Sequence, residues 1–182
     1  RKKNPKAGTF EPLSLVSLMT GPRIGVGEVE NTKCGETWVW VEVQCGHIWF
    51  VSDMLANIPK LPSHPVGKLL FWLTKSAPGY RVFHMAMTFM VKDKRGTLRA
   101  LSDEMKQRPP TVVVPAHGLP VEGPDVAEKT QAVLAAARLG AIVACQNWRL
   151  TGEELRHCIR LVTPRLLIVS ARYQAAAGAL DL

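Results

Sequence analysis

The chain has 182 residues, 47% of them hydrophobic, and a formal net charge of +8. A chain of this length can bury a sizeable core, and it contains no apolar run near the roughly 20 residues of a membrane helix. The positive charge could suit nucleic acid, but four of the charges fall in the first six residues and no zinc finger, helix-turn-helix or aromatic RNA-binding signature accompanies the rest. We therefore expect no membrane and no nucleic-acid partner, while an acidic protein partner fits the charge.

Strand-like segments dominate the first third of the chain. Residues 36–43 alternate in hydrophobicity and, after a short turn, 47–53 form a second strand, which predicts an antiparallel hairpin. The proline-rich segment 54–67 is expected to be irregular, and 68–80 predicts a short helix that ends at Pro78-Gly79. Residues 80–91 fit either a helix or a strand.

Helix-like and strand-like segments alternate in the rest of the chain. Leu98, Leu101 and Met105 recur at helical spacing, so 94–108 predicts a helix, which Pro109-Pro110 terminate. The remaining predicted elements are a strand at 111–114, a helix from about Asp125 to Leu139, a strand at 141–146, a helix at 153–162 and a strand at 165–171. This alternation predicts an α/β protein.

Four cysteines, Cys34, Cys45, Cys145 and Cys158, lie far apart without the Cys-x-x-Cys spacing of a cysteine-based zinc site. We interpret them as reduced thiols of a cytoplasmic protein.

Asp53 ends one apolar strand and His117 follows another. Functional groups tend to lie where strands end, because the sheet fixes the backbone and the loop exposes the side chain. Carboxylate and imidazole are both zinc or iron ligands, and Gly118 would allow a sharp turn beside a metal. An aspartate at a strand end is also a common turn former, so the spacing alone leaves both interpretations open.

Residues 28–127 resemble the C-terminal half of metallo-β-lactamase-fold hydrolases. The shared features are an Asp-x-x-x-Asn turn after a strand, a Val-Lys-Asp sequence and an Ala-His-Gly sequence; they correspond here to Asp53 and Asn57, Val91-Lys92-Asp93, and Ala116-His117-Gly118. The resemblance implies a partial αββα sandwich and a hydrolase that uses zinc or iron. It also implies that Asp53 is the ligand that bridges two metals and that His117 ligates the second metal.

The main ligand motif of that family, His-x-His-x-Asp-His, is absent here. No two of the histidines are separated by a single residue. Asp53 and His117 supply two ligands, whereas a catalytic zinc normally has three protein ligands and a water, so we expect an incomplete site. Either the ligand-bearing half lies on another piece of chain, or the protein is a metal-free relative. We interpret the other histidines as a sheet-edge residue (His47), an exposed loop residue (His64) and a core residue (His84).

Residues from about 130 to 175 resemble the N-terminal region of AMP-dependent acyl-CoA synthetases. The matching positions are Leu139-Gly140-Ala141, Asn147, Arg149, Leu150, Glu154 and Leu155. In that family this region is scaffold, and the phosphate loop and adenylation motifs are missing here. From their residue types alone, we expect Gly140 to end one helix and Thr151 to be the N-cap of the next one.

Three domain segments and three functions follow as hypotheses. The segments are a basic N-terminal part (1–27), a metallo-β-lactamase-like half domain (28–127) and an α/β segment (128–182). The functions are a metal-dependent hydrolase or its inactive relative, whose metal-bound water would attack an ester, amide or phosphodiester; a non-catalytic binding or structural subunit with an acidic partner; and a fragment of an acyl-CoA synthetase. A half sandwich exposes one face of its sheet, so self-association or a covering partner is expected.

Overall fold

The protein is described by a computed structural model that covers residues 21–29, 32, 36–141, 144, 150–169 and 173–180. The strands are β1 (Ile24–Glu28), β2 (Thr37–Val43), β3 (Gly46–Phe50), β4 (Leu55–Ile58), β5 (Gly79–Val82), β6 (Pro110–Val114), β7 (His117–Gly118) and β8 (Val121–Glu122). The helices are the 3-10 turn η2 (Ser52–Met54), α2 (Pro65–Leu73), α3 (His84–Met90), α4 (Lys94–Gln107), α5 (Val126–Arg138), α6 (Gly152–Val162) and α7 (Gln174–Gly178).

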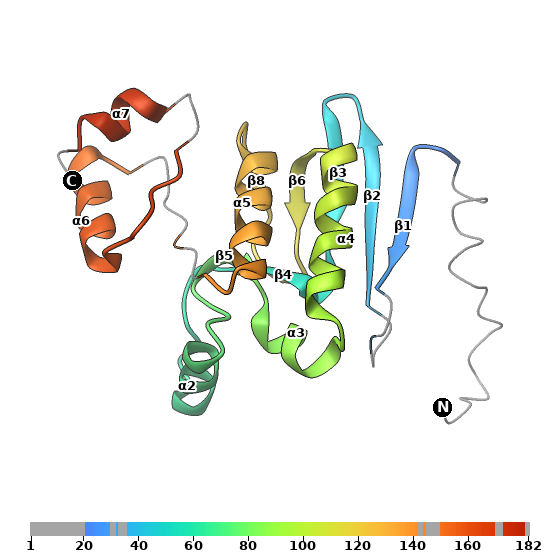
Figure 1. The fold of residues 1–182 in the computed structure, drawn as a ribbon, viewed down its shortest axis with the longest axis horizontal. Coiled ribbons are helices and arrows are strands. Elements are labelled where there is room, and N and C mark those ends of the chain that lie inside the picture. Colours follow the sequence, from blue (N-terminus) through green and yellow to red (C-terminus); the bar gives the residue numbers. More distant parts are fainter. Residues whose placement is uncertain are drawn as a thin grey trace.

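The described strands form two sheets. Five strands follow the order β1-β2-β3-β6-β8, and three follow the order β5-β4-β7 (Figure 1). The predicted hairpin is confirmed, because β2 pairs with β3 in antiparallel fashion. The next pair, β3 with β6, is parallel, and the chain between them includes β4, β5 and the helices α2, α3 and α4. Helices and mixed sheets together confirm the α/β class.

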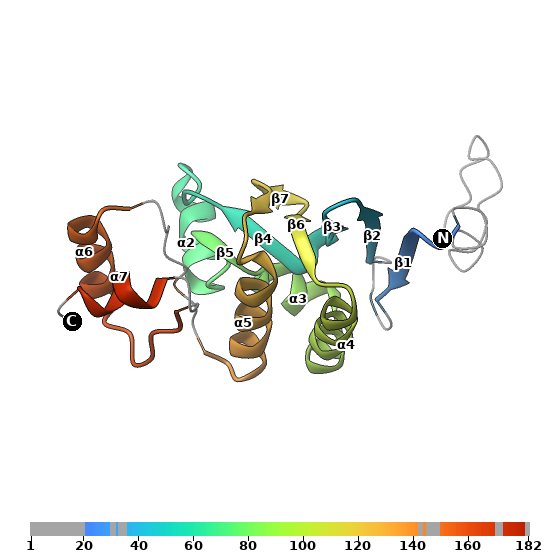
Figure 2. The ribbon, with the colours of Figure 1, turned by 90° about the horizontal axis from the view of Figure 1, so that it is seen from above.

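One face of the five-stranded sheet packs into the hydrophobic core of the molecule. Trp40, Trp49 and Val113 are neighbours across β2, β3 and β6, and all three are buried. The helices α3, α4 and α5 lie on the same side of the strands (Figure 2). Burial of large side chains supplies most of the folding free energy at roughly 25 cal/mol per Å² of apolar surface, so this side holds the sheet to its helices.

The opposite face of the same sheet is apolar but not buried. We call it the open sheet face; its residues on the three central strands are Val39, Val41, Ile48, Phe50, Val112 and Val114, and none of them is buried. Alternation places these side chains on the side away from Trp49 and Val113. A strand with apolar residues on both faces is typical of a sheet that is covered on both sides.

Helix α5 packs onto the core of the preceding segment. Val133 and Leu134 belong to the same buried cluster as the sheet residues, and the Thr130 and Tyr80 hydroxyls are hydrogen-bonded at 2.9 Å. The predicted helix from Asp125 to Leu139 is confirmed to within one residue at each end. Gly140 follows it with φ of +73°, as expected for a helix terminator.

Some segments differ from expectation. The proline-rich segment 54–67 contains β4 and the start of α2, because Leu55 and Ala56 are fully buried and pair with β5. Residues 80–91 divide into β5 and α3 instead of forming one element. The strand expected at 165–171 is wrong over the described residues 165–169, which are not in a strand. Most of the predicted strand 141–146, and residues 1–20, lie outside the described residues.

Candidate functional site

Asp53 lies in η2, directly after the parallel strand β3. The backbone N–H of Val51 donates to the carbonyl of Val114 at 3.1 Å, so the end of β3 is fixed to β6. The turn that follows is anchored by Met54, whose side chain is buried. Asp53 itself keeps 22% of its side chain exposed. The sheet therefore positions a partly solvated carboxylate at the end of a strand.

His117 is held on the opposite side of this turn by β7. Its backbone pairs in parallel with Ala56 of β4, and the N–H of Ala116 donates to the carbonyl of Ser52 at 3.1 Å. The imidazole packs against the ring of Phe83, with 5.1 Å between the ring centroids. More than half of the side chain is exposed, so the ring is positioned but remains accessible.

The structure brings these two predicted site residues together. Nε2 of His117 is 3.1 Å from Oδ1 of Asp53, a distance at which a protonated imidazole forms a salt bridge with the carboxylate. The two residues lie on segments far apart in the sequence, and each is fixed by backbone hydrogen bonds. An exposed imidazole beside a carboxylate can bind a cation or transfer a proton.

Asn57 has a positioning role in this arrangement. Its side-chain Nδ2 donates to the carbonyl of Leu119 at 3.0 Å, and its own carbonyl accepts from the N–H of Leu119 at 2.9 Å. The second residue of the Asp-x-x-x-Asn turn thus fixes the loop after His117. Gly118 has φ of +95°, which confirms the sharp turn expected beside His117.

Glu36 is a site residue that the sequence analysis missed. Its carboxylate accepts hydrogen bonds from the Ser52 hydroxyl and, at 3.4 Å, from the backbone N–H of Asp53. Ser52 has φ of +44°, a left-handed conformation that is uncommon for serine, and these bonds stabilise it. Glu36 precedes β2 in a stretch without a motif, so only the folded arrangement reveals its role.

The described residues do not complete a metal site. A catalytic zinc normally has three protein ligands, whereas Asp53 and His117 provide two donor atoms. In the part of the chain that the structure describes, no group of three or more His, Cys, Asp or Glu side chains is arranged to hold a metal ion. The expectation of an incomplete zinc or iron site remains a prediction that rests on these two residues.

Four other histidines lie in the described chain, and one of them, His157, is part of α6. His47 was expected at a sheet edge, but β3 is an inner strand, and the imidazole contacts the Trp40 ring edge-on at 5.8 Å. His64 is exposed, as expected, at the N-cap of α2. His84 is only half-buried and lines a cavity, so its interpretation as a core residue was wrong.

The region that resembles acyl-CoA synthetases shows a structural motif where it is described. Thr151 is the N-cap of α6 and forms a capping box with Glu154, as expected. These hydrogen bonds from Thr151 lower the pKa of the Glu154 carboxyl. Asn147 and Arg149 lie outside the described residues. No helix among the described residues is long and apolar enough to cross a membrane.

Comparison with known proteins does not assign the chain to a family. No family model, no curated protein and no solved structure matches it. The two resemblances therefore rest on the sequence motifs.

Proposed function

We propose that this chain is the metal-binding half domain of a metallo-β-lactamase-like hydrolase. In this proposal Asp53 and His117 are two ligands of a site whose remaining ligands come from another segment or chain. The single observation that carries it is the 3.1 Å approach of His117 Nε2 to Asp53 Oδ1 in the turn after β3. The contact between two motif positions that are distant in the sequence supports the proposal, because the resemblance implies that both ligate metal.

The open sheet face supports the half-sandwich part of the proposal. The αββα architecture requires a second sheet on the side that α3, α4 and α5 leave free, and this side carries the uncovered residues of β2, β3 and β6. The proposed second sheet would bury Phe50, which is 45% exposed here.

Metal binding by the isolated chain tests the role of the pair. We expect weak zinc binding, because two ligands leave coordination to water, and we expect it to disappear in Asp53→Ala and His117→Ala. Equilibrium dialysis followed by elemental analysis measures the bound zinc. The matched controls are His64→Ala and Asp103→Ala, which remove an exposed histidine and an exposed aspartate and should leave binding unchanged.

Two results would contradict the proposal. One is zinc occupancy of far less than one ion per chain under saturating conditions. The other is equal binding by the wild type and both site variants, which would place the metal on other residues.

A non-catalytic binding subunit is the second candidate, and the open sheet face favours it independently of any metal. Contiguous exposed apolar surface of this kind marks an interaction site in soluble proteins. This candidate predicts association without zinc and without any effect of Asp53→Ala. Sedimentation velocity of the metal-free wild type and of Asp53→Ala, run beside the dialysis experiment, therefore separates it from the first.

A further inference from the structure

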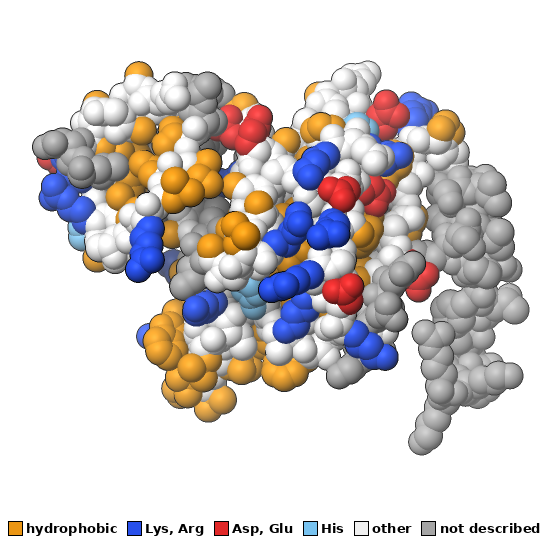
Figure 3. Space-filling model, in the orientation of Figure 1, with side chains coloured by type: hydrophobic (Ala, Val, Ile, Leu, Met, Phe, Trp, Pro, Cys, Tyr) orange, Lys and Arg blue, Asp and Glu red, His pale blue; other side chains and the backbone are white. Residues whose placement is uncertain are grey.

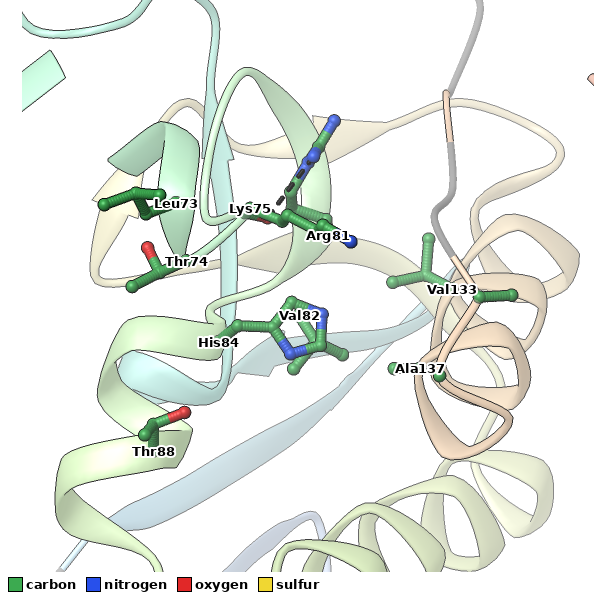
Figure 4. Close-up of a pocket in the computed structure, with 11 residues that line it drawn as sticks. Leu73, Thr74, Lys75, Arg81, Val82, His84, Thr88, Val133 and Ala137 are labelled. Carbon is green, nitrogen blue, oxygen red and sulfur yellow. Dashed lines mark hydrogen bonds between the residues drawn. The ribbon is translucent and has the colours of Figure 1, made fainter. Parts of the chain in front are cut away.

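A cavity of about 420 Å³ lies between the end of α2, β5, α3 and α5, and the proposed metal ligands do not line it. Lys75, Arg81, His84 and Val133 contribute to its wall. Figure 4 shows the His84 ring pointing into this space, with Val133 and Ala137 of α5 facing it and the Lys75 side chain beside it. Its volume is within the range of small-molecule sites.

The polar side of the cavity is positively charged. Lys75, Arg81 and His84 line it, and Lys94 donates from its Nζ to Thr88, another lining residue, at 3.2 Å. None of the lining residues is acidic. Figure 3 shows Lys and Arg side chains gathered over the middle of this face, next to a histidine. An anion that enters the cavity would therefore meet cations on several sides.

The pKa of His84 reflects the burial and the positive charge around this cavity. Burial lowers its pKa from the ordinary value, and the charges of Arg81, Lys94 and Lys75 lower it further. These three cations, which lie on β5, at the start of α4 and just after α2, all favour its neutral form. A bound anion would reverse part of that effect and raise the pKa of His84.

The other side of the cavity is apolar. Val133 and Val82 are buried side chains of α5 and β5, and Leu73 and Ala137 extend the same wall. Inorganic phosphate could contact the cations but would leave this wall unused. A ligand with a charged head and a short hydrocarbon body contacts both sides.

We propose that this cavity binds a small organic carboxylate, with its head toward Lys75 and the Thr88 hydroxyl that Lys94 contacts, and its apolar body against Val82 and Val133. The site is separate from the Asp53–His117 pair and does not depend on the function proposed for it.

The probes are hexanoate, its uncharged analogue hexanamide, and inorganic phosphate, each titrated into the full chain with ¹³C-labelled histidine. We expect hexanoate to shift the His84 resonances saturably near neutral pH and to raise the pKa of His84. The affinity for hexanamide and for phosphate should be lower than that for hexanoate by at least about tenfold, since each of these two probes lacks one half of the interaction.

Lys75→Asn removes one cation without disturbing the backbone, because Lys75 has φ of +54° and asparagine tolerates that conformation. We expect hexanoate affinity to fall about tenfold, the usual scale for one charge-assisted hydrogen bond. Lys60→Asn, at an exposed loop lysine outside the cavity, is the matched control and should change nothing. Lys94→Gln on the exposed side of α4 is a second variant if Lys75→Asn lowers the melting temperature.

Three outcomes would overturn the proposal: no shift of His84 with hexanoate, equal affinity for hexanoate and hexanamide, or equal loss in the Lys60 and Lys75 variants. The last would show attraction to the overall positive charge and not to this cavity.

Discussion

Gly118 allows the backbone next to His117 to pack closely against β4. A Cβ atom at this residue would lie 1.9 Å from the carbonyl oxygen of Asn57, far inside van der Waals contact. The parallel pairing of β7 with β4 brings these two backbones together. The residue after His117 must therefore be glycine for steric reasons as well as for its positive φ.

Gly118→Ala should therefore destabilise the fold more than a substitution that adds only backbone strain. Gly123→Ala is the matched control, since Gly123 has φ of +128° but no atom within 4 Å of the added Cβ. We expect the free energy of unfolding to fall by about 2 kcal/mol more in Gly118→Ala than in Gly123→Ala. Urea denaturation of both variants measures the difference, and equal losses would show that the contact with Asn57 relaxes at little cost.

The sequence predicts some of these residues and not others. Asp53, His117 and Gly118 can be predicted from the sequence, because each follows an apolar strand and functional side chains tend to lie where strands end. Glu36 has no such pattern around it, since it contacts its partners Ser52 and Asp53 only in the folded β2–β3 hairpin. His84 is embedded in an apolar stretch, so the sequence favours a core interpretation that the folded position of α3 overturns.

Helix α4 is fixed to the sheet by one carboxylate. The indole Nε1 atoms of Trp38 and Trp40 donate to the two oxygens of Glu104 at 2.5 and 2.9 Å. Arg108 lies over the Trp40 ring at 4.3 Å, and its carbonyl accepts from Nε1 of Trp49. Apolar burial and these hydrogen bonds together determine how α4 crosses the strands.

Glu104→Ala should cost about 2 kcal/mol of the free energy of unfolding, because two indole N–H groups lose their acceptor in a partly buried site. Glu104→Gln keeps one acceptor oxygen and should lose less. Asp103→Ala, at the exposed neighbouring residue, should stay within about 0.5 kcal/mol of the wild type. Chemical denaturation measures all three; equal stability of the Glu104→Ala and Asp103→Ala variants would mean that water replaces the carboxylate.

At the level of elements, periodicity predicts long segments better than short ones. The helices α4, α5 and α6 and the hairpin β2–β3 are confirmed, since each has enough residues for a clear apolar repeat. The four-residue strand β4 lies in a proline-rich segment, and its pairing with β5 and β7 determines it more than its own composition. The apolar residues 165–169 fit a strand by composition, but the described structure leaves them unpaired with any strand.

Exposed apolar surfaces distinguish the whole molecule. One is the open sheet face; another is α2, over which hydrophobic side chains gather in Figure 3, with Trp72 64% exposed. Apolar residues such as Leu166 and Ile168, after α6, are exposed as well. On the sheet face adjacent strands carry matching apolar residues, so this surface is contiguous across three strands, although Phe50 alone among them is more than a third exposed. We expect it to be the principal association surface.

We predict that the chain self-associates through the open sheet face and that Phe50→Lys reduces this association, because it places a charge on the strand between β2 and β6. Trp72→Lys adds the same charge on α2 and is the matched control, with no expected effect. Sedimentation velocity across the micromolar range measures the state of each variant. A wild-type chain that stays monomeric throughout, or a stronger effect of Trp72→Lys, would contradict this assignment.

The burial of Trp38, Trp40 and Trp49 beneath α4 also gives the molecule an intrinsic optical probe. Their three indole N–H groups are hydrogen-bonded to α4 or to Arg108, the residue that caps its C-terminus, whereas Trp72 is exposed on α2. Undocking of α4 would transfer these indoles into water while leaving the surroundings of Trp72 nearly unchanged. Among the four tryptophans in the described part of the chain, the three buried ones thus give a fluorescence signal that reports on the contact between one helix and one sheet.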